Sequence, residues 1–291
     1  MPPNPVEPLV TLLDLESIEV NIFRGRTAET GLPRVFGGQV AAQALVAAGR
    51  TVDPGRPVHS LHAYFLRPGD PAVPIVYEVD RIRDGRSFTT RRVVAIQHGE
   101  AVFHLSASFH VAEPGLEHQV EMPAAPDPET LPTFAERMKP WAAEMGRRFE
   151  LLRPIDIRYV DDPPRAAREG GATREPRQQV WMRADGRLPD DPLVHVCAVT
   201  FASDFTLLDS VLLAHGKAWG RNDIRGASLD HAMWFHRPFR ADEWLLYDQE
   251  SATASGARGL ARGHIFSADG RLLVTVVQEG MIRVVDRGQG A

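Results

Sequence analysis

An apolar helix followed by antiparallel strands is predicted twice along this 291-residue chain. Three landmarks recur in the same order: Gly49-Arg50 matches Gly216-Lys217, Tyr64–Pro68 matches Trp234–Pro238, and the turn residue Gly99 matches Gly270. Subtraction of the residue numbers gives offsets of 216 − 49 = 167, 237 − 67 = 170 and 270 − 99 = 171. Loop-length changes between copies produce such a drift, so we interpret the pattern as a duplicated unit. Chance matching of short apolar segments is the alternative.

Each copy is predicted to be an α+β unit. Residues 37–50 are rich in helix formers and apolar around most of the helix, so this helix must be buried on nearly all sides. Four strand-like segments follow, separated by turn residues: 58–66, 75–82, 88–97 and 101–111. A buried helix followed by an antiparallel meander predicts a curved sheet wrapped around that helix. In the second copy we predict strands at 179–183 and 194–201 and a helix at 204–217 that Asp204 opens.

The two units are expected to be separated by a proline-rich stretch. We predict an N-terminal unit at residues 1–112, a linker at 113–150 and a C-terminal unit at 151–291. Six prolines fall between residues 114 and 140, in a stretch with few strand formers, and a short helix is predicted around 134–148. An ordered loop packed on one unit is an equally good interpretation of the middle of this stretch.

Composition excludes several classes of function. The net charge is −5 and the isoelectric point is near 6.1, so no basic surface for nucleic acid is expected. Cys197 is the only cysteine, which excludes an intrachain disulfide; its apolar surroundings predict a buried strand thiol rather than a nucleophile. The chain has no run of about 20 apolar residues and no secretory signal pattern, so neither a membrane span nor export is expected. A cytoplasmic location is therefore predicted.

Polar residues distinguish the second copy from the first. With the offsets above, Asp204 corresponds to Gly37, Ser228 to Val58 and Gln278 to Ala107. Each has a structural explanation on its own, since Asp commonly caps a helix, and a Ser at a strand start or a Gln at a strand end is more often structural. A buried polar group costs free energy unless it is paired, so three of them confined to one copy predict a functional site there.

Four motifs give the chain a resemblance to the acyl-CoA thioesterase II family. They are RVFGGQ at 34–39, YFLRPG at 64–69, RDGRSF at 83–88 and DHAMWFHRP at 230–238. The resemblance covers nearly the whole chain and is weakest across the linker. It implies a tandem double hotdog fold and hydrolysis of fatty acyl-CoA thioesters without a cofactor. The family's catalytic Asp, Thr or Ser, and Gln fall on Asp204, Ser228 and Gln278, where Ser keeps the hydroxyl of the more familiar Thr.

Thioester hydrolysis needs an oriented water, a base and donors aimed at the developing oxyanion. The resemblance implies that Asp204 activates the water while Ser228 and Gln278 orient it. An anionic side chain is favoured at a helix N-terminus, so the predicted helix start at Asp204 would help to keep it ionised and could supply N–H groups to the oxyanion. Direct attack by water is therefore the hypothesis. No residues that bind CoA can be named from the sequence.

Other arrangements are disfavoured. Ser228, Asp230 and His231 contain the types of a catalytic triad, but alternation along a strand points His231 away from the other two. His59 and His62, and likewise His231 and His236, have no acidic or thiolate cluster beside them, so no metal site is predicted. The glycines at 256, 259 and 263 indicate a flexible hairpin rather than a dinucleotide site.

Two alternative functions stay open at this level. A hotdog acyl-CoA hydratase would use the same fold, because fold alone does not decide chemistry. A non-catalytic acyl-CoA binding protein would bind the ligand without turnover. Sheet edges and the family resemblance also predict a homo-oligomer.

Overall fold

The structure, a computed structural model, describes residues 4–27, 32–145, 154–167, 173–219 and 223–285. Its N-terminal elements are α1 (Glu7–Leu13), β1 (Glu16–Glu19), β2 (Ile22–Gly25), α2 (Gly37–Gly49), β3 (Val58–Phe65), β4 (Ile75–Asp84), β5 (Phe88–Gln97) and β6 (Glu100–His110). The connecting region holds η1 (Pro128–Thr130), α3 (Phe134–Met138), η2 (Lys139–Trp141) and α4 (Ala142–Met145). The C-terminal elements are β7 (Ile155–Tyr159), α6 (Pro164–Ala167), β8 (Arg177–Ala184), α7 (Pro192–Ser203), α8 (Asp209–Leu213), β9 (Ile224–Ser228), β10 (Asp230–Phe235), β11 (Leu245–Ser255), β12 (Arg258–Ser267) and β13 (Leu272–Val284).

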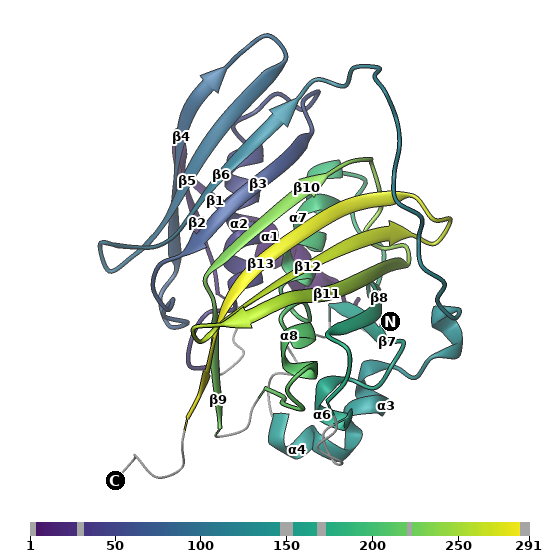
Figure 1. The fold of residues 1–291 in the computed structure, drawn as a ribbon. Coiled ribbons are helices and arrows are strands. Elements are labelled where there is room, and N and C mark those ends of the chain that lie inside the picture. Colours follow the sequence, from purple (N-terminus) through teal and green to yellow (C-terminus); the bar gives the residue numbers. More distant parts are fainter. Residues whose placement is uncertain (1–3, 28–31, 146–153, 168–172, 220–222, 286–291) are drawn as a thin grey trace.

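The described strands form one antiparallel sheet of 13 strands. Their order is β1-β2-β4-β5-β6-β3-β10-β13-β12-β11-β8-β7, with β9 paired to β13. The sequence predicts two sheets. In the structure the two halves join edge to edge, because β3 pairs with β10, and the pair His62↔Ala232 lies at the centre of the paired stretch. Figure 1 shows this junction between the blue and the green strands. The predicted strands at 58–66, 75–82, 88–97, 101–111 and 179–183 are confirmed within two residues at each end.

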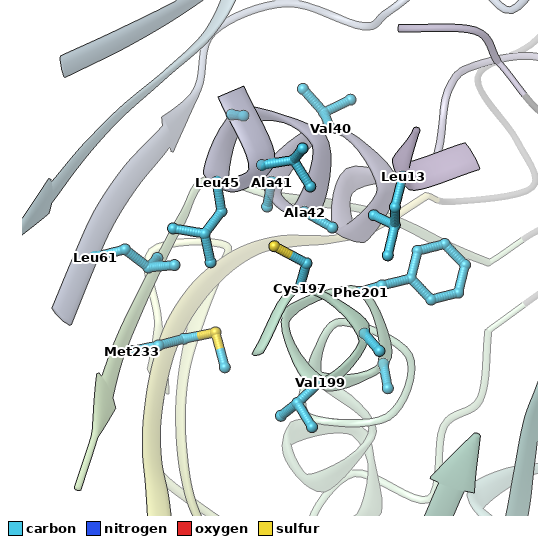
Figure 2. Close-up of a cluster of buried hydrophobic side chains, with 14 of the residues drawn as sticks. Leu13, Val40, Ala41, Ala42, Leu45, Leu61, Cys197, Val199, Phe201 and Met233 are labelled. Atoms are coloured by element: carbon cyan, nitrogen blue, oxygen red, sulfur yellow. The ribbon is translucent and has the colours of Figure 1, made fainter. Parts of the chain in front are cut away.

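Two apolar helices, α2 and α7, form the centre of the core. They run antiparallel, since Gly38 near the start of α2 lies against the carbonyl of Phe201 near the end of α7, and Gly49 lies against Leu193 at the other end. A Cβ atom on Gly38 would come within 2.4 Å of the Phe201 carbonyl oxygen, so this close approach needs glycine. Figure 2 shows how the small side chains of α2 let the two helices pack closely beside Cys197.

The helix of the second copy lies earlier in the chain than predicted. Residues 194–201, predicted as a strand, belong to α7, and most of 204–217, predicted as a helix, is turn except for α8. A continuous apolar run suits a buried strand and a buried helix equally well. The Asp-Pro pair before the run is the local signal that was missed: Asp191 caps the helix by accepting from Leu193 N, and Pro192 occupies its first turn.

This correction changes one of the three offsets between the copies. The starts of α2 and α7, at Gly37 and Pro192, give an offset of 192 − 37 = 155 in place of 167. Asp204 follows the end of α7 as Arg50 follows the end of α2, so matching Asp204 with Gly37 was wrong. The strand offset of 170 holds, since Asp230–Phe235 of β10 corresponds to residues 60–65 of β3, and these strands pair with each other.

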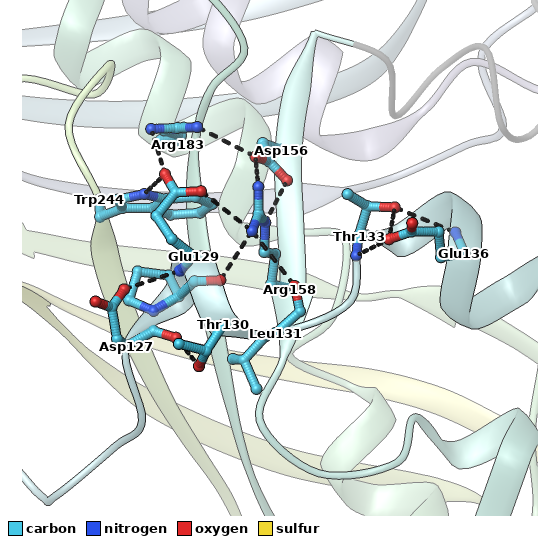
Figure 3. Close-up of polar contacts among 11 residues, drawn as sticks. Asp127, Glu129, Thr130, Leu131, Thr133, Glu136, Asp156, Arg158, Arg183 and Trp244 are labelled. Carbon is cyan, nitrogen blue, oxygen red and sulfur yellow. Dashed lines mark hydrogen bonds and ion pairs between the residues drawn. The ribbon is translucent and has the colours of Figure 1, made fainter.

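The segment between the halves is an ordered loop along the second half. Trp181 donates to the carbonyl of Pro126, and the side chain of Gln119 bonds the backbone at Gly270 and Leu272. Figure 3 shows Glu129 beside Trp244, Arg158 and Arg183. Met122, Ala125 and Leu131 pack on the apolar cluster of Trp181, Leu246 and Phe266. These contacts favour the ordered-loop interpretation. The short helix predicted around 134–148 appears as α3, η2 and α4 over residues 134–145, and residues 146–148 lie outside the described residues.

Within the described residues, no helix combines the length and the apolar character that crossing a bilayer would require. The turn at Gly256 and Ala257, both with positive φ, joins β11 to β12, so the glycine-rich stretch is a hairpin as predicted.

Candidate active site

Asp204, Ser228 and Gln278 meet at one carboxylate oxygen. The hydroxyl of Ser228 donates to Asp204 Oδ1 at 3.1 Å, and the amide Nε2 of Gln278 donates to the same oxygen at 2.5 Å. Ser228 and Gln278 lie 24 and 74 positions beyond Asp204 in the sequence, so only tertiary structure brings the three together. The three residues selected from the sequence therefore lie in one cluster.

Three separate elements position this cluster. Asp204 follows the last turn of α7, Ser228 ends β9, and Gln278 lies inside β13, where it faces Ala261 of β12. Ser228 pairs with Gly280 two residues along β13, which sets the hydroxyl and the amide on the same stretch of sheet. Gln278 is fully buried, whereas Asp204 and Ser228 are partly exposed to a cavity.

The helix start beside Asp204 belongs to α2 and not, as predicted, to a helix that Asp204 opens. The backbone N–H of Gly38 donates to the Asp204 carboxylate, and Oδ2 lies 2.7 Å from where a Cβ on Gly37 would stand. The N-cap residue of α2, Phe36, supplies no side-chain hydrogen bond. Asp204 therefore caps α2 from another segment of the chain. The dipole that favours its ionised form is that of α2.

Gly37 and Gly38 lie against the Asp204 carboxylate, and the comparison of polar residues between the copies did not select them. Two glycines at a helix start, preceded by a residue that cannot cap, leave N–H donors and space for a group from elsewhere in the chain. That combination was a usable signal in the sequence. It could not have identified Asp204 as the partner, since the two segments belong to different halves of the chain.

Burial dominates the electrostatics of Asp204. Desolvation raises the pKa of Asp204 to about 6, and the hydrogen bonds from Gln278, Ser228 and Gly38 together with the charge of Arg34 oppose this rise. The carboxylate is thus mostly ionised at neutral pH yet basic enough to accept a proton. A pKa near the working pH is typical of a general base.

A cavity of about 840 Å³ opens beside the cluster. Phe36, Phe65 and Phe205 line it near Asp204, and Ile157, Met138 and Ile224 line it farther along the C-terminal half. The described lining also includes Arg34, Arg67, Arg165 and Arg225, and its only carboxylates are Asp204 and Asp209. The cavity therefore combines apolar walls with cationic groups.

Asp209 is a second buried carboxyl group on this cavity. Burial raises the pKa of Asp209 to about 7, while hydrogen bonds from Tyr159 and Trp219 work in the opposite direction. Its hydrogen bonds go to these two aromatic side chains, whereas Asp204 is held by Ser228 and Gln278. Asp209 accepts from the Tyr159 hydroxyl at 3.1 Å beside the cavity.

The corresponding place in the first half is filled. Ala107 faces Arg91 across β5 and β6, as Gln278 faces Ala261 across β12 and β13. The Arg91 side chain is buried; it donates to Thr51, the second residue after α2, at 2.8 Å and pairs with Asp84 at 2.6 Å. A guanidinium thus occupies the space that the amide and carboxylate occupy in the second half.

The alternative arrangements do not form. Ser228 bonds Asp204, the ring of His231 bonds Ser203, and Asp230 accepts from the backbone of Glu279, so these three make no triad. Cys197 is buried as predicted but lies on a helix, and burial raises the pKa of its thiol, which disfavours a nucleophilic role. No cluster of three or more His, Cys, Asp or Glu that could hold a metal ion occurs among the described residues.

Family models match both halves of the chain. Residues 24–110 match the acyl-CoA thioesterase N-terminal domain, and residues 150–281 match the acyl-CoA thioesterase family. The chain is 41% identical to human acyl-coenzyme A thioesterase 8 over 288 residues, which cover 95% of this chain and 89% of the relative. The chain belongs to the acyl-CoA thioesterase II family. It is also 40% identical to acyl-CoA thioesterase 2 of Haemophilus influenzae, covering 94% of this chain and 96% of that protein.

Solved structures agree with this membership. An acyl-CoA thioesterase II from Mycobacterium marinum is 48% identical, with a TM-score of 0.78 over 95% of this chain and 98% of its own. A hotdog-fold protein from Alicyclobacillus acidocaldarius is only 20% identical but has a TM-score of 0.76 over 96% of this chain and 99% of its own. The second likeness concerns the fold alone, and it relates the large antiparallel sheet to hotdog proteins.

Proposed function

We propose that this thioester hydrolase cleaves acyl-CoA to a free fatty acid and CoA with a water activated by Asp204 and oriented by Ser228 and Gln278. One observation carries the proposal: Asp204, on the wall of the large cavity, accepts hydrogen bonds from both other residues at one oxygen. Its second oxygen, Oδ2, faces the start of α2 beside Gly37 on the wall of the cavity. A carboxylate fixed in this way can receive a proton without changing its position.

The reaction balances with these groups alone. Asp204 takes one proton from water as the water oxygen bonds to the thioester carbonyl carbon, and the carbonyl becomes an oxyanion. The first turn of α2, where Gly37 lines the cavity, is the proposed source of N–H donors to that oxyanion. When the intermediate collapses, the C–S bond breaks and the CoA thiolate takes the proton back from Asp204.

Ser228 and Gln278 have different tasks in this scheme. Ser228 lines the cavity, so its hydroxyl can contact the water directly. Gln278 is buried and acts through the carboxylate, which it holds at 2.5 Å. Its amide therefore sets the direction in which Asp204 presents its second oxygen.

The charges around the cavity support a CoA thioester as the substrate. CoA carries several phosphate charges at one end and an apolar acyl chain at the other. Arg34, Arg67, Arg165 and Arg225 line the same cavity as the aromatic walls, in a chain whose net charge is −5. Arginine is the side chain best suited to binding phosphate.

Isotope labelling tests direct attack by water. We expect a single turnover with excess enzyme in ¹⁸O-labelled water to place the label in the fatty acid and none in the Asp204 peptide. Label in that peptide would indicate an anhydride formed on Asp204 and would refute the scheme. Undiminished turnover by a Ser228→Ala variant would show that Ser228 takes no part in the reaction. Ser228→Thr is expected to keep activity because the hydroxyl remains.

Family membership favours hydrolysis over the hydratase and over the non-catalytic binding protein. Release of free thiol from acyl-CoAs of increasing length, with no enoyl product, would separate the three. We also propose that the fold is a double hotdog whose units meet at β3 and β10, with divisions near residues 112 and 150, and that the protein self-associates in the cytoplasm. Absence of nucleic-acid binding stays a prediction.

A further inference from the structure

His231 lies beside Gln278 with its side chain turned into the core. Strand β10 pairs with β13 from Ala232↔Val277 onward, so His231 and Gln278 are the residues that follow this pair toward the site, where the register shifts by one to Ser228↔Gly280. Both are buried, with exposed fractions of 1% and 0%, and both fall on the inward-facing positions of their strands. Opposite positions on one face of an antiparallel pair bring side chains within reach.

Each of these two side chains has one buried polar atom without a hydrogen-bond partner among the described residues. The atoms are His231 Nδ1 and Gln278 Oε1. Their other polar atoms are used: His231 Nε2 lies 2.8 Å from Ser203 Oγ, and Gln278 Nε2 donates to Asp204. An unsatisfied buried polar group costs about 1–3 kcal/mol, so two adjacent ones are strongly disfavoured.

We propose that His231 is a positioning residue: its Nδ1–H donates through one buried water to Gln278 Oε1 and fixes the orientation of the Gln278 amide. The inference rests on the proposed function of Gln278. A carboxamide can flip so that its oxygen and nitrogen exchange places, which would turn Oε1 toward the Asp204 carboxylate and replace attraction by repulsion. A donor at Oε1 prevents that flip. Burial lowers the pKa of His231 to about 4, so the ring is neutral and carries only one N–H.

The tautomer of the His231 ring distinguishes a positioning role from a purely structural role. Ser203 Oγ can donate either to Thr200 O at 3.0 Å or to His231 Nε2. If Ser203 donates to the ring, the ring proton is on Nδ1 and points toward Gln278. If Ser203 donates to Thr200, the ring proton is on Nε2 and His231 merely bonds Ser203, leaving Oε1 of Gln278 without a donor.

Nitrogen NMR of ¹⁵N-histidine-labelled protein, with His231 assigned by substitution, measures the tautomer directly. We expect the neutral Nδ1–H form at pH 7. The Nε2–H form would overturn the proposal whatever the activity of the variants. This measurement does not depend on turnover, so it distinguishes failure of this inference from failure of the proposed hydrolysis.

Two isosteric substitutions test the effect on catalysis. The amide nitrogen of Asn occupies roughly the place of Nδ1, and that of Gln roughly the place of Nε2. We therefore expect His231→Asn to keep kcat within about threefold, and His231→Gln to lower kcat roughly tenfold with little change in KM, as expected for loss of one hydrogen bond. Equal kcat values for the two variants, at equal folded fraction, would refute the role.

His195 provides the matched control. It is also a buried histidine with one unpartnered nitrogen within the described part of the chain, but its Nδ1 accepts from Ala241 N, and it bonds none of the three site residues. His195→Gln is expected to lower the unfolding temperature without changing kcat. In a Gln278→Ala background, His231→Gln should cause no further loss of kcat, since the group that it positions is gone. A full additional loss of kcat in that background would show that His231 acts by another route.

Discussion

Replacing Asp204 with Asn should stabilise the protein while it abolishes hydrolysis. Burial raises the pKa of Asp204 from 3.8 to about 6, so the folded protein gives up free energy to keep this group ionised at pH 8. Because one pKa unit corresponds to ~1.4 kcal/mol, this rise amounts to ~3 kcal/mol. Because Asp204 is partly exposed to the cavity, solvent screening reduces this figure, and we take ~1–2 kcal/mol as the expected gain.

The pH dependence identifies the cause of that gain. Because the pKa of Asp204 is raised in the folded wild type, the stability that its protonated carboxyl contributes is fully present below the unfolded-state pKa of 3.8. This stability is lost as pH rises through about 6. The difference in unfolding free energy between the Asn variant and the wild type should therefore grow between pH 5 and pH 8. Asp209 titrates in both proteins, so its contribution cancels in the difference.

Urea unfolding followed by tryptophan fluorescence, at unit pH steps from 5 to 8, measures this difference. In parallel, kcat/KM of the wild type should fall below pH 6, and the variant should lose at least about 100-fold at every pH, the usual effect of removing a general base. A stability difference that is constant with pH would refute the raised pKa. Near-normal hydrolysis by the Asn variant would refute the role of Asp204.

Three further predictions follow from the cavity and the core. Gly37→Ala should lower kcat at least tenfold, because the new Cβ would stand 2.7 Å from the Asp204 carboxylate. The control Gly55→Ala, whose Cβ would have no atom within 4 Å, should match the wild type. Equal activity of the two variants would count against the close approach at Gly37. Arg34→Gln should raise KM several-fold for acyl-CoA in a stopped assay, but not KM for acyl-pantetheine, which lacks the nucleotide phosphates. The control Arg92→Gln should leave KM unchanged for both substrates. An equal rise of KM for both substrates in the Arg34 variant would exclude a phosphate contact. Cys197 should resist a thiol reagent at pH 8 until the protein is unfolded, as mass spectrometry would show, because burial raises its pKa; rapid labelling of the native protein would contradict the buried helix.

Local patterns were sufficient for the strands at 58–66, 75–82, 88–97, 101–111 and 179–183, but not for residues 194–201. The alternation and turn residues of 58–66 and 88–97 specify strands because a half-buried sheet needs that period. Gln278 could be selected as a candidate from the sequence because an amide inside an apolar strand must find a hydrogen-bond partner. Ser228 and Gln278 were also placed correctly relative to the first copy, because strand pairing preserves their spacing from the turns.

Other features depended on contacts between distant segments. The apolar run at 194–201 does not by itself decide between helix and strand; the Asp191-Pro192 pair before it indicates a helix, and its packing against α2 fits the helix. That packing places the Asp204 carboxylate at the start of α2, a relation that no spacing in the sequence encodes. The joining of β3 to β10 is likewise a choice of partner edge, which strand patterns leave open.

The sequence was thus enough to predict a duplication and a resemblance to the family, and that resemblance implied the three residues of the candidate site. Tertiary contacts were needed to learn which helix Asp204 caps, how strongly burial raises its pKa, and that His231 stands beside Gln278. Desolvation and hydrogen bonding act over a few ångströms in space, whereas the groups that surround Asp204 come from α2, β9 and β13, which are widely separated along the chain. No pattern read within one segment can therefore report the environment that those segments create together.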